Sequence, residues 1–308
     1  MRFNSKARLN TRRMGDAGGS GLRGGGRGGG LPIPGGLAGG GIGTLVVVVI
    51  VVLVSMWLGG GSSGGGGYDS GRMSDTGRYD QCQTGEDANS SSDCARVAVE
   101  NSLNDYWSKT LPEQSDASFE PEQKVETFSG GINTGCGQAS ADVGPFYCPN
   151  DQTIYLDTTF FHDVLQGQLG GPSGAFVEPY VLAHEFGHHI QNLLGTMSKV
   201  KTQQGPHSDS VKLELQADCY AGMWAHSATT TKDEQGVVLI TDLTQQDVQQ
   251  AIEAATAVGD DRIQQQSGGS VNPDSWTHGS SAERVQWFRT GYTTGSLDAC
   301  DTFAPGAV

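Results

Sequence analysis

The chain has 308 residues, enough for one sizeable domain or two, and a net charge of −15. The first 44 residues carry seven basic side chains and one acidic one, whereas the remainder carries 12 basic and 33 acidic ones. Such an acidic surface repels nucleic acid and anionic lipid head groups, so we expect no nucleic-acid partner beyond weak contacts by the basic N-terminal tail.

The N-terminal part of the chain predicts a tail followed by a membrane span. Residues 1–41 are rich in Gly and Arg, and we expect them to be disordered because they cannot bury a core. The next 17 residues, IGTLVVVVIVVLVSMWL (42–58), carry no charge and reach the lower limit for crossing a bilayer. The alternative, a buried strand, is disfavoured by flanks so rich in glycine. The basic stretch before the run is also too long for a cleaved signal peptide.

The charge asymmetry about residues 42–58 predicts the topology. Basic residues stay in the cytoplasm, so the N-terminus is predicted to be cytoplasmic and everything after residue 60 extracytoplasmic. The protein would then be a single-pass protein of the cell membrane. Residues 59–78 have the Gly/Ser composition of a flexible linker, and residues 79–308 are predicted to form a globular domain.

Six cysteines, all after the predicted span, are consistent with an oxidising compartment. Their spacing favours disulfides between Cys82 and Cys94 and between Cys136 and Cys148, which leaves Cys219 with Cys300. Other pairings stay open, since connectivity does not follow from sequence alone. A cysteine-based metal site is the weaker alternative, because the sequence contains no CxxC motif.

The globular part predicts more helix than strand. Helices are expected at residues 93–110, 177–194, from about 208–210 to 227, 244–261 and 284–289, and strands at residues 125–129 and 153–156. Gly195 and Gly291 are the expected C-terminal caps, and capping boxes precede the last two helices. No βαβ rhythm or repeat is present, so we predict an α+β domain, mostly helical with a small β-sheet.

The helix expected at residues 177–194 contains the stretch YVLAHEFGHHIQNLLG. His184 and His188 lie one turn apart, about 40° round the helix from each other, with Glu185 on the same half. Gly187 is expected to leave a gap beside them. HExxH arises by chance in roughly one chain in a hundred of this length, so an amphipathic helix with a satisfied polar edge is the alternative.

A third candidate ligand lies on the next predicted helix. A catalytic zinc takes three protein ligands and a water, and KLELQAD places Glu214 and Asp218 four residues apart on one face. Glu214 is the predicted ligand, and Asp218 is predicted to accept the free N–H of a liganding histidine. A solvated helix edge is the alternative, which the apolar neighbours of Glu214 disfavour. His207 is the best spare ligand.

These motifs resemble known zinc peptidases. HEFGH and ELQAD, with 25 residues between them, are similar to the gluzincins. GPFYCPNDQTIYLD, HEFGHHIQ, ELQADCYAGMWA and THGSSAERVQWF together resemble the bacterial family of putative neutral zinc metallopeptidases, over about residues 80–303. The resemblance implies a zincin-like fold, one zinc ion held by His184, His188 and Glu214, and a catalytic Glu185.

The THGSSAERV segment adds a second candidate catalytic residue, His278. Some membrane-associated gluzincins carry a similar Thr-His-Pro stretch close to the active site, and Gly279 replaces that proline here. His278 is predicted to stabilise the oxyanion, and local capping of the loop is the alternative. His189 is predicted to be structural, and surface or packing roles are favoured for the remaining histidines, His162, His207 and His226.

The sequence as a whole predicts a membrane-anchored zinc endopeptidase that cleaves extracytoplasmic proteins or peptides. In this mechanism zinc lowers the pKa of a bound water, and Glu185 takes the water's proton and passes it to the leaving amine. One alternative is a catalytically silent zinc module used for binding. Another is a zinc hydrolase of cell-wall peptides.

Overall fold

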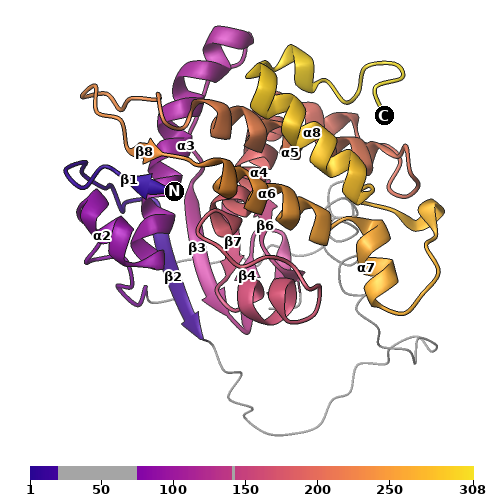
Figure 1. The fold of residues 1–308 in the computed structure, drawn as a ribbon, viewed down its shortest axis with the longest axis horizontal. Coiled ribbons are helices and arrows are strands. Elements are labelled where there is room, and N and C mark those ends of the chain that lie inside the picture. The colour runs from indigo at the N-terminus through magenta and orange to yellow at the C-terminus, as the bar shows by residue number, and fades with distance from the viewer. Residues whose placement is uncertain (20–74, 141–142) are drawn as a thin grey trace, which may run out of the picture.

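A small mixed sheet and the helices packed against it form the folded part of the protein. The computed structural model describes residues 1–19, 75–140 and 143–308 (Figure 1). The α-helices in these ranges are α2 (Gly85–Ser90), α3 (Ser92–Gln114), α4 (Val177–Leu193), α5 (Asp209–Ser227), α6 (Gln245–Ala257), α7 (Asp260–Gln266) and α8 (Ser281–Thr294). The strands are β1 (Arg2–Phe3), β2 (Met14–Gly19), β3 (Lys124–Ser129), β4 (Gly131–Thr134), β5 (Gly137–Ser140), β6 (Phe146–Cys148), β7 (Thr153–Asp157) and β8 (Ile240–Asp242).

The main sheet has the strand order β2-β3-β7-β6. Strands β2, β3 and β7 run parallel, and β6 pairs antiparallel with β7. Every residue of β7 is buried, as is typical of a strand in the centre of a parallel sheet. This order leaves β6 at the edge of the sheet, where it contacts α4. The mixture of helices with a small sheet agrees with the predicted α+β class.

Local sequence signals placed most helix starts correctly. The capping boxes predicted for α6 and α8 both form, between Thr244 and Asp247 and between Ser280 and Glu283. Gly195 follows α4 with a φ of 69°, the left-handed cap predicted from the sequence. The stretch 244–261, predicted as one helix, is two, because α6 ends at Ala257 and α7 begins three residues later.

The predicted end of α8 at Gly291 is wrong. The helix continues to Thr294 and is capped by Gly295, whose φ is 59°. Gly291 serves packing instead: a Cβ built there would lie 1.8 Å from the backbone oxygen of Cys219 on α5. The glycine therefore lets the backbones of α5 and α8 approach closely; Figure 1 shows the two helices next to each other.

The three predicted disulfides are present. Cys82 pairs with Cys94, Cys136 with Cys148, and Cys219 with Cys300. The last bond closes a loop of 81 residues and ties α5 to the segment that follows α8. All six cysteines lie in the described residues, and none of them is free.

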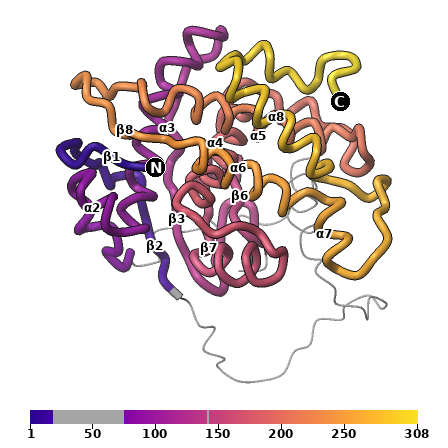
Figure 2. Tube along the Cα trace, in the orientation of Figure 1, coloured from indigo at the N-terminus to yellow at the C-terminus, as the bar shows by residue number. Residues whose placement is uncertain are grey.

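The prediction of a disordered tail over residues 1–41 is wrong for residues 1–19. This segment forms β1, which pairs with β8, and β2, which adds to the edge of the main sheet beside β3 (Figure 2). Phe3, Ala7 and Met14 belong to the main hydrophobic core, with exposed fractions of 3–4%. The average composition of residues 1–41 hid this ordered segment, because the glycine-rich run begins only near Gly18.

The predicted membrane helix at residues 42–58 lies outside the described residues and stays a prediction. Within the described ranges, none of the helices combines the length and apolar character needed to cross a bilayer. The predicted linker, 59–78, lies outside them up to residue 74. Its last residues belong to the domain, since Thr76 donates to Asp16 at 2.5 Å and Arg78 pairs with Asp93 at 2.9 Å.

Asp105 on α3 gives a test of the fold by pH. Partial burial, and then the nearby Asp233, raise the pKa of Asp105 from 3.8 to about 6. The native state therefore binds this proton more tightly than the unfolded state, and stability falls as pH rises from about 4 to 6. Asp105→Asn should be more stable than the parent at pH 7.5 and gain little at pH 4, measured by urea unfolding.

The matched control is Glu113→Gln, an exposed carboxylate on the same helix. It should shift the unfolding midpoint little, and equally at both pH values. A gain for Asp105→Asn that is the same at pH 4 and pH 7.5 would contradict the pKa shift.

Candidate metal centre and active site

The structure brings together the three side chains that the sequence predicts as zinc ligands. His184 Nε2 lies 3.2 Å from one oxygen of Glu214, and His188 Nε2 lies 3.3 Å from the other. One ligand atom from each of the three residues lies within 4.8 Å of the others, and all three residues are buried. Tetrahedral zinc with bonds near 2.0–2.1 Å separates its ligands by about 3.3 Å, so this donor set fits the ion.

The crossing of α4 and α5 sets these distances. A Cβ built at Gly187 would lie 3.0 Å from the backbone oxygen of Ala217 and 3.1 Å from its Cα. The gap predicted at Gly187 is therefore filled by α5. Close approach of the two backbones is what carries Glu214 to within ligand distance of both histidines.

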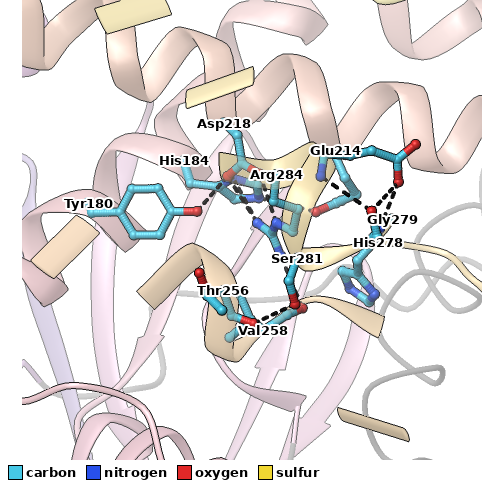
Figure 3. A network of polar contacts seen from close by, with 12 residues as sticks. Tyr180, His184, Glu214, Asp218, Thr256, Val258, His278, Gly279, Ser281 and Arg284 are labelled. Carbon is cyan, nitrogen blue, oxygen red and sulfur yellow. Dashed lines mark hydrogen bonds and ion pairs between the residues drawn. The ribbon is translucent and has the colours of Figure 1, made fainter. Parts of the chain in front are cut away.

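Asp218 holds the next layer of the site together. Its carboxylate accepts from Tyr180 Oη at 2.6 Å and pairs with His184 Nδ1 at 2.8 Å. Arg284 of α8 donates to the same carboxylate from Nε at 2.7 Å and from Nη2 at 3.0 Å (Figure 3). Burial alone would raise the pKa of Asp218, but Arg284 and His184 hold it at about 2. Asp218 therefore stays ionised.

The partners of the two histidines leave each Nε2 free for metal. Asp218 only accepts hydrogen bonds, so His184 carries its proton on Nδ1. His188 Nδ1 lies 2.8 Å from Gln191 Oε1. The Gln191 amide is oriented by its nitrogen, which donates to the carbonyl of Leu213 at 2.7 Å, so its oxygen faces His188. Such partners fix the tautomer and ring orientation of metal-binding histidines.

Gln191 and Arg284 are site residues that the sequence reasoning did not assign. Gln191 stands three residues after His188, so both lie on one helix face, a signal that was available. Arg284 lies inside the THGSSAERV motif, but its partner Asp218 is 66 residues away in sequence. No local pattern predicts that pairing.

Glu185 faces the same cavity without taking part in the ligand cluster. Its side chain is buried, with 7% exposed, and no hydrogen bond or ion pair to it is present among the described residues. Burial raises the pKa of the Glu185 carboxyl, which brings it closer to neutral pH. A free carboxylate beside an ion that polarises water is suited to act as a general base.

His278 lies on the loop before α8 and lines the cavity with the ligand cluster. Its Nδ1 lies 3.3 Å from Asp260 Oδ1, and the other oxygen of Asp260 accepts the backbone N–H of Thr277, His278 and Gly279. Gly279 has a φ of 85°, which proline cannot adopt, and this explains why glycine replaces the proline of the related motif. Asp260 was not predicted from the sequence.

The cavity has a volume of about 180 Å³ and mostly apolar walls. Its apolar lining comes from the loop before β6, from β6 itself and from the helices: Val143, Pro145, Phe146, Tyr147, Pro149, Phe160, Val164, Leu169, Val181, Met197, Val200, Leu213, Val258 and Ile263. The polar groups are concentrated at the metal cluster, Glu185, His278 and Arg284. An apolar cleft with a few convergent polar groups is typical of a binding site for a mostly apolar ligand segment.

The remaining histidines lie away from this chemistry. His189 donates from Nε2 to the carbonyl of Glu120 at 2.7 Å, and its Nδ1 accepts from Tyr147 Oη at 3.1 Å. Burial lowers its pKa to about 4, so it is neutral and structural, as predicted. His162, His207 and His226 are exposed and do not line the cavity.

Comparison with known proteins agrees with this site. A family model described as putative neutral zinc metallopeptidase matches residues 2–303. The chain belongs to this family. Rv2575 of Mycobacterium tuberculosis (strain ATCC 25618 / H37Rv) is 51% identical over 226 residues, 73% of this chain and 75% of that protein. YpfJ of Escherichia coli (strain K12) is 43% identical over 205 residues, 65% and 67% respectively. No solved structure is significantly similar.

The family match extends the resemblance found in the sequence. That resemblance began near residue 80, whereas the family model begins at residue 2 and so includes β1 and β2. The family's description implies zinc, and the cluster of His184, His188 and Glu214 is where the described residues can hold it.

Replacing Glu214 tests whether it is the third zinc ligand. Glu214→Ala removes the carboxylate that lies between both histidines and should empty the site of most of its zinc. His207→Ala, the control, should keep full zinc content, since His207 is exposed and outside the cluster. Zinc is measured in purified protein by atomic emission. Loss of zinc from His207→Ala together with its retention by Glu214→Ala would show the assignment to be wrong.

Replacing Gln191 tests the orientation of His188. Gln191→Leu removes the acceptor for Nδ1 and should weaken zinc affinity by about 10- to 100-fold, the usual effect of losing such a partner. Gln191→Glu keeps an acceptor and should retain most of the affinity. Both are measured by competition with a zinc chelator. Parent-like affinity of Gln191→Leu would exclude the role.

Proposed function

We propose that the protein is a zinc-dependent endopeptidase. The observation that carries this proposal is the free, buried Glu185 carboxylate beside a cluster of only three protein ligands among the described residues. A structural zinc site is usually closed by four protein ligands and has no need of such a carboxylate. Three protein ligands would leave one position of a tetrahedral zinc for water, which supports a catalytic site.

The reaction follows from the placement of these side chains. Zinc bound by His184, His188 and Glu214 supplies Lewis acidity, which favours deprotonation of water and polarises a carbonyl. Glu185 accepts one proton from the attacking water as its oxygen bonds to the scissile carbonyl carbon. The carbon–nitrogen bond then breaks, and Glu185 returns the proton to the leaving amine. Water is consumed, and one acid and one amine are formed.

His278 is the proposed second polar group of the reaction. Asp260 fixes the loop and faces Nδ1 of His278, so Nδ1 carries a proton and Nε2 can donate into the cavity only when the ring is protonated on both nitrogens. A donor at this position would stabilise negative charge on the carbonyl oxygen.

The shape of the site supports an extended peptide as substrate. Strand β6 is the edge of the described sheet and lies at the cavity wall with Phe146 and Tyr147. An extended peptide can pair with such an edge, and its backbone then supplies most of the hydrogen bonds. The apolar walls favour large apolar side chains near the cleaved bond.

We propose that cleavage takes place outside the cytoplasm, on proteins or peptides near the membrane. Three disulfides and no free cysteine in the described residues support an oxidising compartment. The apolar run at residues 42–58 supports contact with the membrane. The acidic net charge supports the absence of a nucleic-acid partner.

Glu185→Gln separates catalysis from zinc binding. The variant keeps the shape of the side chain and removes its basicity, so zinc content should match the parent. Hydrolysis of a peptide library should fall by about 10²- to 10⁴-fold, as expected for loss of a general base. Glu253→Gln, an exposed glutamate on α6, is the matched control and should cleave at the parent rate.

Near-parent cleavage by Glu185→Gln with zinc in place would exclude this mechanism. A zinc-loaded parent that cleaves no member of the library would favour the silent binding module. Cleavage of cell-wall peptides alone would favour the hydrolase of those peptides.

A further inference from the structure

Residues 1–19, which we name the N-terminal strap, are built into the domain that carries the active site. Strand β1 pairs with β8, and β2 pairs with β3 from Met14 to Gly19. Between them, Leu9 donates its N–H to Gln83 and Gly85 donates to Ala7, each at 2.9 Å. The strap is therefore bonded to segments from three widely separated parts of the chain.

The strap also supplies a cation to a buried pair of carboxylates. Arg13 Nε lies 2.9 Å from Glu100 Oε1 and 3.5 Å from Glu122 Oε1. Both glutamate side chains are fully buried, at 0% exposure. Burial and the neighbouring Glu100 raise the pKa of Glu122 well above its usual range, because two negative charges in this buried site repel each other. Arg13 offsets negative charge on this pair.

A chain of hydrogen bonds continues from the strap to the zinc-binding helix. Thr127 donates to Asp16 at 2.7 Å, and Tyr79 donates to Thr127 at 2.9 Å. Arg96 donates to Tyr79 at 2.9 Å and forms an ion pair with Glu178 in the first turn of α4. Docking of the strap and the position of α4 therefore belong to one polar network.

These contacts limit how residues 20–74 can meet a membrane. Strand pairing cannot form across a hydrocarbon core of about 30 Å, so residue 19 and residue 75 must lie on one side of it. A single crossing by residues 42–58 would put them on opposite sides. We infer that the N-terminal strap and the active site lie on the same side of any membrane that the protein contacts.

This inference replaces the predicted cytoplasmic N-terminus. With the active site outside the cytoplasm, the N-terminus lies there too. On this inference Arg8, Arg12 and Arg13 do not count as cytoplasmic charges, because they belong to the folded domain. The inference concerns topology and holds whether or not the protein cleaves peptides.

Thiol labelling of the full-length chain in intact cells tests it. All six native cysteines are in disulfides, so one introduced cysteine is the only reactive thiol. Lys6→Cys reports on the strap, and Ser270→Cys reports on the active-site domain; both positions are exposed. A membrane-impermeant maleimide should label both variants in intact cells, or both only after permeabilisation. Labelling of one in intact cells and of the other only after permeabilisation would overturn the inference.

A pair of matched arginine variants tests strap docking without any reference to activity. Arg13→Gln removes the cation from the buried glutamates, whereas Arg12→Gln removes the same charge from an exposed position one residue earlier. In the full-length protein Arg13→Gln should lower the melting temperature by several degrees, and Arg12→Gln should leave it within about one degree. Equal melting temperatures for the two variants would show that the strap is not docked.

Discussion

The carboxylate of Asp218 is the point on which the rest of the site depends. It binds Tyr180 and His184 from α4 and Arg284 from α8, while itself belonging to α5. Three helices are thus held at one fully buried charge. Breaking a buried pair such as Asp218–Arg284 typically destabilises a protein by about 3–5 kcal/mol, because the remaining charge has no partner. The same contact orients a ligand histidine, so folding and metal geometry are linked.

The charges at the site leave the metal in a strongly polarising environment. Arg284 cancels the charge of Asp218, so the one uncompensated anion among the proposed ligands is Glu214. His188 is oriented by the neutral amide of Gln191, which adds no negative charge. A dication held by one carboxylate and two neutral imidazoles would keep a net positive charge. That charge lies in a cavity with apolar walls, where electrostatic effects are stronger than in water.

The sequence predicted those features that depend on local geometry. The spacing of His184 and His188 and of Glu214 and Asp218 follows from helix periodicity, and both pairs lie where that period places them. Capping boxes are equally local, and both formed. Features that depend on distant partners were missed. Arg284 meets Asp218 across 66 residues, and Gly187 and Gly291 matter through backbones that belong to other helices.

The N-terminal strap was also missed from the sequence, because its strands depend on distant partners in the sheet. A strand at the edge of a sheet is defined by its partner, and β2 has a short, glycine-containing sequence with little strand character of its own. The feature that requires the strap lies instead in the interior of the domain. Glu100 and Glu122 are buried together, and the negative charge of two buried carboxylates is stabilised by a proton or a cation. The buried glutamates therefore have a neighbouring cation only when Arg13 of the strap is docked.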